Sequence, residues 1–98
     1  MPEKKQQVPS IGRIVHYKLP GGTNRGHYRP AIIVRVWDEP ATPESLVQLQ
    51  VFTDGQNDGL VGFPNVIWET SVKPGDGFGE YIWPPYVPAV SAPAEAGS

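Results

Sequence analysis

The chain contains no cysteine among its 98 residues. This excludes disulfide frameworks, thiolate metal sites and a cysteine nucleophile. Proteins of the reducing cytosol commonly lack disulfides, so we expect a cytoplasmic protein. The two histidines, His16 and His27, fall on different predicted elements and form no metal-ligand pattern. We therefore predict no metal, and nothing in the sequence points to a cofactor.

Long apolar runs and an excess of positive charge are missing as well. No stretch approaches the ~20 apolar residues that cross a bilayer, and residues 1–7 lack the apolar centre of a signal peptide. We expect no membrane association. The 8 basic and 10 acidic residues give a net charge of −2, which argues against general nucleic-acid binding. A local basic patch remains compatible with this balance.

Glycine and proline are abundant, and they decide the fold class. With 11 glycines and 12 prolines, almost every potential helix is interrupted. The intervening segments are β-branched or alternate between apolar and polar residues, which is typical of strands. The predicted strands cover residues 12–19, 31–37, 46–53, 65–72 and 80–83. We predict an all-β fold, either a small SH3-like barrel or a curled antiparallel sheet of about five strands.

The predicted domain is small. We expect a flexible N-terminus over residues 1–8, a β-barrel domain over 9–85 and a disordered Pro/Ala-rich tail over 86–98. A core of this size is marginal, and self-association would support it, so we expect a homo-oligomer. Trp68 is predicted to fill the core or a subunit seam.

The second predicted strand is almost continuously apolar, so its buried face is ambiguous. If Ile32, Val34 and Val36 face the core, then Ile33, Arg35 and Trp37 share the other face. An arginine beside an exposed aromatic ring can stack on a base or on a partner's ring. Trp37 is equally compatible with a place in the core or at a seam.

Two loops contain candidate binding residues. A glycine-rich basic loop over residues 20–29 leads into the second strand, where it places cationic groups at the edge of an apolar sheet. A flexible connector is the favoured interpretation of that loop, with an anion-binding loop as the alternative. The Asp54–Gly59 segment contains residues that tolerate turns, and a solvated turn is favoured over a site for a hard cation.

Much of the sequence resembles a family of small bacteriophage and prophage proteins. The resemblance rests on residues 11–17, 29–37, 50–55, 57–59 and 68–72. It implies a phage origin, and so a place in the bacterial host cytoplasm, but no settled activity. Small phage proteins often act against host defences, some by sequestering nucleotide signals in oligomeric pockets, whereas others are minor virion parts.

A shorter stretch is similar to the MazF/PemK-type toxin ribonucleases with an SH3-like barrel. The similarity consists of Gly12 to Val15, the glycine-rich basic loop, Arg29 to Val34, and a strand ending in Thr53. It implies that Arg29 takes the place of the family's catalytic arginine and Thr53 that of its strand-end threonine. A guanidinium there would stabilise the phosphorane formed when a ribose 2′-OH attacks.

The leading hypothesis is a non-enzymatic phage accessory protein that holds an anionic nucleotide-like ligand or a host protein. A MazF/PemK-like endoribonuclease and a virion component are the alternatives. The predicted ligand-binding residues are Arg25, His27, Tyr28, Arg29, Arg35, Trp37, Thr53, Asp54, Asn57 and Asp58. If Arg29 is buried in a structural ion pair, this hypothesis of a ligand held by Arg29 fails.

Overall fold

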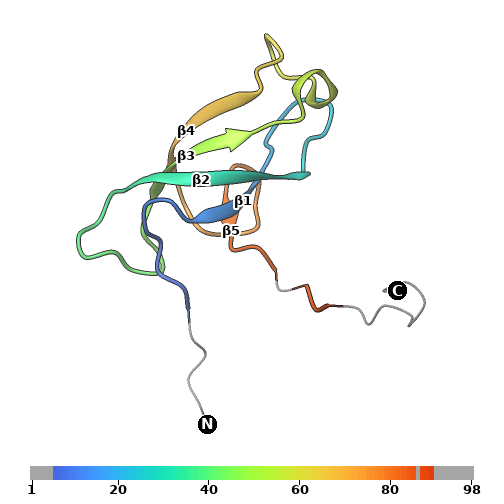
Figure 1. Cartoon of the computed structure of the whole chain (residues 1–98). Helices are drawn as coiled ribbons and strands as arrows, with labels where there is room; N and C mark the ends of the chain where they lie inside the picture. The colour runs from blue at the N-terminus through green and yellow to red at the C-terminus, as the bar shows by residue number, and fades with distance from the viewer. Residues whose placement is uncertain (1–5, 86, 90–98) are drawn as a thin grey trace, which may run out of the picture.

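The chain folds into one strongly curled antiparallel sheet of five strands. The computed structural model describes residues 6–85 and 87–89. The strands are β1 (Ile14–Lys18), β2 (Tyr28–Val36), β3 (Val47–Phe52), β4 (Val66–Val72) and β5 (Tyr81–Ile82), in the order β4-β3-β2-β1-β5. A 3-10 helix, η1 (Gly55–Asp58), follows β3. The all-β prediction is confirmed, and each strand lies within or close to its predicted range (Figure 1).

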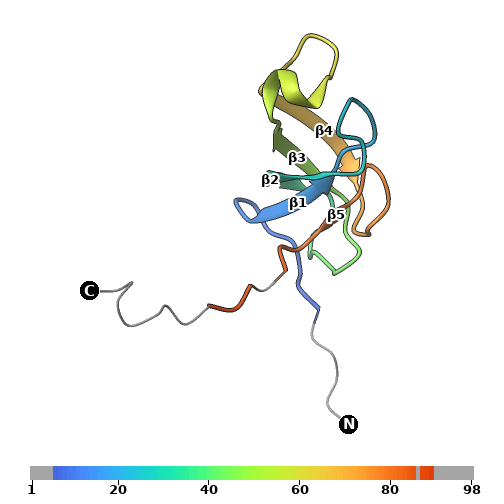
Figure 2. The same ribbon diagram turned by 90° about the vertical axis from the view of Figure 1, so that its right-hand side faces the viewer.

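The short β5 connects the two ends of the sheet. It pairs with β1, and the backbone N–H of Tyr81 also donates to the carbonyl of Lys73, just after β4, at 3.1 Å. The N–H of Gly75 returns a hydrogen bond to the carbonyl of Tyr81 at 2.9 Å. These bonds bring the chain beyond β4 back against β5, which gives the small barrel-like curl seen in Figure 2.

One face of the sheet forms the core. Ten buried hydrophobic residues cluster inside the curl: Val15, Tyr17, Leu19, Ala31, Ile33, Val47, Leu49, Val51, Val72 and Tyr81. Alternate residues of β1 and β3 point inward, as their sequence pattern predicts. So small a core supplies limited hydrophobic stabilisation. Polar contacts between loops, described below, therefore contribute a larger share of the stability.

Of the two possible faces of β2, the one considered as buried, with Ile32, Val34 and Val36, is correct only for Val36. Ala31 and Ile33 are fully buried, whereas Val34 is 39 % exposed. A β-bulge between Ile33 and Arg35 inserts Val34 as an extra residue, after which Val36 packs against the core. Trp68 is 55 % exposed and does not belong to the core.

An acidic side chain points into the curl. Glu69 pairs with the buried Leu49 across β3 and β4, so it shares the inner face and lies near the phenol of Tyr17. Burial raises the pKa of Glu69. Burial, together with the charge of Glu69 and a hydrogen bond to it, raises the pKa of Tyr17 to about 12. The ionised carboxylate is therefore less favourable in the folded state than in water.

We expect Glu69→Gln to stabilise the fold at neutral pH. Because folding raises the pKa of Glu69, the stabilising effect of the protonated carboxyl is complete below its ordinary pKa of about 4.5. It is lost as the pH rises through the folded-state pKa. Urea unfolding should therefore show the variant to be more stable than the wild type at pH 7, with a smaller difference at pH 3. Glu44→Gln, at an exposed position, is the control; an equal effect of both changes would contradict the interpretation.

Candidate functional site

The 20–29 loop, whose last two residues begin β2, lies beside η1 at one end of the sheet, in both Figure 1 and Figure 2. The side chain of Asp58, at the end of η1, is fully buried between them. Its Oδ1 accepts hydrogen bonds from Arg29 Nη2 at 2.6 Å and Asn24 Nδ2 at 2.9 Å. Its Oδ2 accepts from Arg29 Nε at 2.9 Å and from the backbone N–H of Asp54 at 2.8 Å. The Asp54–Gly59 segment is thus an anchored turn and not simply a solvated one.

The Arg29 guanidinium is committed to this ion pair. Only 18 % of its side chain is exposed, and its remaining terminal nitrogen, Nη1, donates to the carbonyl of Tyr28 at 2.9 Å. Hydrogen bonding to Arg29 is the largest cause that lowers the pKa of Asp58, well below its ordinary value. Arg29 is therefore held in the structural ion pair that removes it from the predicted anion site. Both Arg29 and Asp58 join the two loops.

The proposed partner of Arg29 in a ribonuclease is also occupied. The hydroxyl of Thr53 donates to the carbonyl of Pro64 and accepts from the N–H of Gly55 at 3.2 Å. All three nitrogens of Arg29 and the hydroxyl of Thr53 therefore already have partners within the described part of the fold. Nearby, the side chain of Asn57 donates to the Asp54 carboxylate at 3.2 Å, and Asn24 donates to the carbonyl of Asn57 at 3.1 Å. The contacts of these loop residues thus hold the loops together.

A second group of side chains lies on the surface beside the anchored loop. The Arg25 guanidinium lies 3.7 Å from the centre of the Phe78 ring, and the Lys18 ammonium lies 5.0 Å from the same centre. Lys18 is also 5.8 Å from the centre of the Tyr28 ring, and Tyr28 is its cross-strand partner. We call Lys18, Arg25, Tyr28 and Phe78 the cation–aromatic cluster. His16 lies next to it, 6.4 Å from the Tyr28 ring centre, and His27 is exposed in the adjoining loop.

The backbone holds the cluster in place. Arg25 Nε donates to the carbonyl of Pro20 at 3.1 Å, and Lys18 Nζ donates to the carbonyl of Asp76 at 2.9 Å. Gly26 has a φ of +91°, which favours glycine, and a Cβ atom there would make only van der Waals contact with the Phe78 ring, at 3.4 Å. The terminal nitrogens of Arg25 make no hydrogen bond within residues 6–85 and 87–89, so their N–H groups are available to donate to a ligand.

The other predicted pair is separate from this cluster. The Arg35 guanidinium lies 4.1 Å from the centre of the Trp37 ring, so these two exposed side chains stack on each other, and their stacking on a base or a partner's ring stays a prediction. Arg35 is seven positions after Tyr28 in β2, which is roughly 20 Å at about 3.3 Å per residue. The ten predicted ligand-binding residues therefore divide into three groups: the anchored loops, the cation–aromatic cluster with His27, and the Arg35–Trp37 pair.

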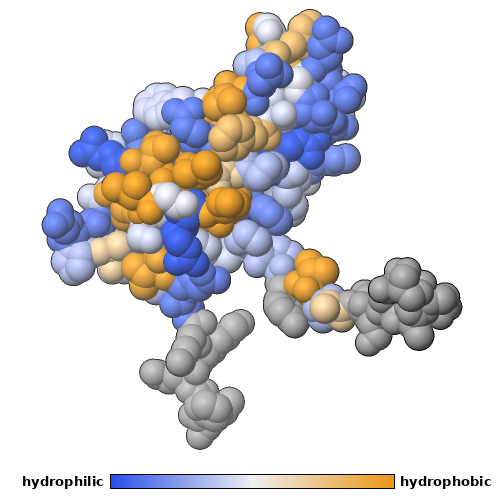
Figure 3. All heavy atoms as spheres, in the orientation of Figure 1, coloured by the Kyte–Doolittle hydropathy of each residue, from blue (hydrophilic) through white to orange (hydrophobic). Residues whose placement is uncertain are grey.

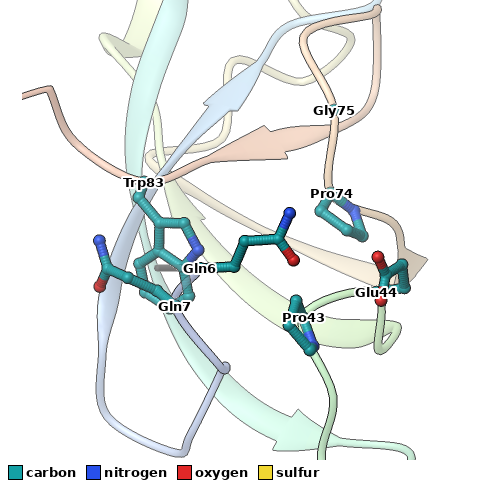
Figure 4. Close-up of a pocket in the computed structure, with 7 residues that line it drawn as sticks. All are labelled: Gln6, Gln7, Pro43, Glu44, Pro74, Gly75 and Trp83. Carbon is teal, nitrogen blue, oxygen red and sulfur yellow. The ribbon is translucent and has the colours of Figure 1, made fainter. Parts of the chain in front are cut away.

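An open groove of about 490 Å³ lies elsewhere, between the N-terminal segment and the loop after β4 (Figure 4). Its lining includes Gln6, Gln7, Pro43 and Trp83, and no residue predicted to bind a ligand. The Arg13 guanidinium lies 4.8 Å from the Trp83 ring centre and donates to Gln7 Oε1 at 2.6 Å. None of the residues that line the groove belongs to the cation–aromatic cluster or to the anchored loops.

Two members of the cluster, Lys18 and Phe78, were not predicted from the sequence. Lys18 had a detectable signal, because alternation in the first strand puts it on the outer face with His16. Phe78 lies in a glycine-rich loop, and its contact with Arg25 joins positions far apart in the chain. No local pattern reports such a contact.

Comparison of the chain with family models, curated proteins and solved structures finds no match. Over the described ranges, no three histidine or acidic side chains gather in a way that suits a metal ion. The same residues include no helix of the length and hydrophobicity needed to span a bilayer. The functional assignment therefore depends on the geometry of the site.

Proposed function

We propose that this protein is a non-enzymatic binding protein that holds an anionic, nucleotide-like ligand at the cation–aromatic cluster. The observation that carries the proposal is the pair of cations, Lys18 and Arg25, placed over one exposed aromatic ring, Phe78, with Tyr28 alongside. On such a surface, the cationic groups can bind phosphate, and the guanidinium plane and the aromatic rings can stack on a base.

The chemistry of the cluster suits both halves of a nucleotide. Arg25 already covers the Phe78 ring, so a base would stack on the outer side of the guanidinium plane or on Tyr28. The terminal N–H groups of Arg25 and the ammonium of Lys18 would donate charge-assisted hydrogen bonds to phosphate oxygens. His16 and His27 extend the donor set at the edge.

The anchored loops make this site preorganised. Arg25 and Tyr28 belong to the segment that Asn24 and Arg29 tie to the buried Asp58. A binding loop that is already ordered loses less conformational entropy when its ligand arrives. This is the role in binding that we assign to Arg29 and Asp58, which position the site and do not touch the ligand.

A function against host defence follows from the resemblance to small phage proteins. In that setting, the protein would withhold a nucleotide signal from a host enzyme by binding it, without changing it chemically. The geometry of Arg29 and Thr53 does not favour the ribonuclease alternative, because both groups are engaged within the fold.

We expect the full-length protein to bind at least one compound from a panel of ribonucleoside mono-, di- and triphosphates and cyclic dinucleotides in isothermal titration calorimetry. Lys18→Ala and Arg25→Ala should each weaken that binding roughly 10- to 100-fold. This is the loss expected when one charge-assisted hydrogen bond of about 1.5–3 kcal/mol is removed. Because both side chains lie on the surface, the melting temperature should change little.

Arg35→Ala is the matched control. It removes another exposed cation that stacks on an aromatic ring, at the far end of β2. Binding should be retained in this variant. No binding by any compound of the panel, or an equal loss in Arg35→Ala, would show that the cluster is not the site.

A further inference from the structure

The outer face of the sheet presents a row of mostly apolar side chains across four strands. Ile14, Ile32, Gln50 and Trp68 are successive cross-strand partners on β1, β2, β3 and β4. Phe52 and Val66 form the next pair along β3 and β4, and Val34 projects from the bulge in β2. We call these seven residues the outer belt.

The outer belt is exposed to an unusual degree for apolar side chains. Trp68 is 55 % exposed, Ile14 54 %, Val66 43 %, Phe52 40 % and Val34 39 %. Figure 3 shows hydrophobic residues gathered over β1 and β2, with hydrophilic residues around the end that carries η1. A contiguous apolar surface of this kind, with a polar surround, is typical of an interaction site.

The belt contains no charge. Glu69 is the one acidic residue in the five strands, and it points into the core. Of the cations in these strands, Lys18 and Arg35 lie towards opposite ends, and Arg29 is held by Asp58. A second surface of the same kind can therefore cover the belt without burying a charge, which would otherwise be costly.

The exposed area is sufficient for a dimer. With about 150–250 Å² for each large side chain, the belt exposes on the order of 500 Å² in each copy. Two copies would then bury on the order of 1,000 Å² before the surrounding side chains are counted, which reaches the lower limit for a specific interface. This burial would add to the hydrophobic stabilisation that the ten buried residues supply in the described part of the chain.

We propose that two copies of this chain pack sheet against sheet through the outer belt. Two sheets that pack face to face keep their strands within about 30° and interdigitate the side chains of the facing surfaces. Trp68 and Phe52 provide the large rings that usually dominate the energy of such contacts. The cation–aromatic cluster lies at the end of the strands, outside the belt.

Sedimentation equilibrium of the full chain from about 1 to 200 µM tests this proposal. The wild type should show twice the mass of its 10.7 kDa chain at the upper concentrations. Trp68→Glu and Ile14→Glu, at opposite sides of the belt, should each raise the dissociation constant of the dimer at least tenfold. Their far-UV circular dichroism should match that of the wild type, which separates loss of the dimer from loss of the fold.

Val61→Glu is the control, because Val61 is apolar and fully exposed but lies in the loop before β4. It should leave the dimer unchanged. A wild type that remains monomeric throughout this range would overturn the proposal. So would Trp68→Glu and Ile14→Glu variants that fold and dimerise as the wild type does.

Discussion

Replacement of Asp58 by alanine is expected to lower the free energy of unfolding by about 3–5 kcal/mol, the usual cost of removing one partner of a buried ion pair. The Asp58 side chain is fully buried and accepts four hydrogen bonds. Its loss leaves the Arg29 guanidinium, the Asn24 amide and the Asp54 N–H without their acceptor. Small domains have only about 5–15 kcal/mol in total, so the change should be evident in urea unfolding.

The same carboxylate makes the stability of the wild type depend on acid pH. Hydrogen bonding to Arg29 lowers the pKa of Asp58 in the folded state. Its contribution is therefore complete above the ordinary pKa of about 3.9, and it is lost progressively as the pH falls towards the folded-state value. Unfolding measurements from pH 6 to pH 2 should show this loss in the wild type and a much smaller one in Asp58→Ala.

Asp54→Ala is the control for Asp58→Ala. Asp54 is exposed, and its side chain has one hydrogen bond, from Asn57. Its removal should cost less than about 1 kcal/mol, as surface changes usually do. Equal losses in the two variants would show that the buried carboxylate has no special part in joining the loops.

The strands could be predicted because each has a local cause. Alternating residues in β3, such as Val47, Leu49 and Val51, identify a half-buried strand without any knowledge of its neighbours. The buried face of β2 could not be predicted in the same way. Its continuous apolar run hides the alternation, and the bulge at Val34 then reverses which residues face the core.

The candidate site was harder to predict, because its contacts join distant parts of the chain. The sequence identifies Arg25, His27 and Tyr28 as members of a basic loop beside a strand, and the structure puts them close to one surface. The sequence gives no indication that the Asp58 side chain turns inward to pair with Arg29, since Asp-Gly segments usually form exposed turns. Burial of that carboxylate depends on donors from Asn24, in the loop before β2, and from Arg29, near the start of β2.

Replacement of Gly22 by alanine is expected to lower the free energy of unfolding by about 2–4 kcal/mol, from backbone strain and steric overlap together. Gly22 has a φ of +83°, and an added Cβ would collide with the backbone carbonyl oxygen of Asp58. It would also lie 2.9 Å from Leu60 Cδ2. The adjacent N–H of Thr23 donates to the same carbonyl at 2.7 Å, so the methyl group would separate the 20–29 loop from η1.

Substitutions at two other glycines separate the cost of backbone strain from the cost of steric overlap. Gly12 has a φ of +89° and nothing within 4 Å of an added Cβ, so Gly12→Ala should show only the backbone cost, about 1 kcal/mol. Gly21 has open space as well and no positive φ in this range, so Gly21→Ala should leave stability nearly unchanged. Urea unfolding of the three variants should therefore rank Gly22→Ala as the most damaging. If Gly12→Ala were equally damaging, the loss would come from backbone strain alone, and close packing of the loop on η1 would not be its cause.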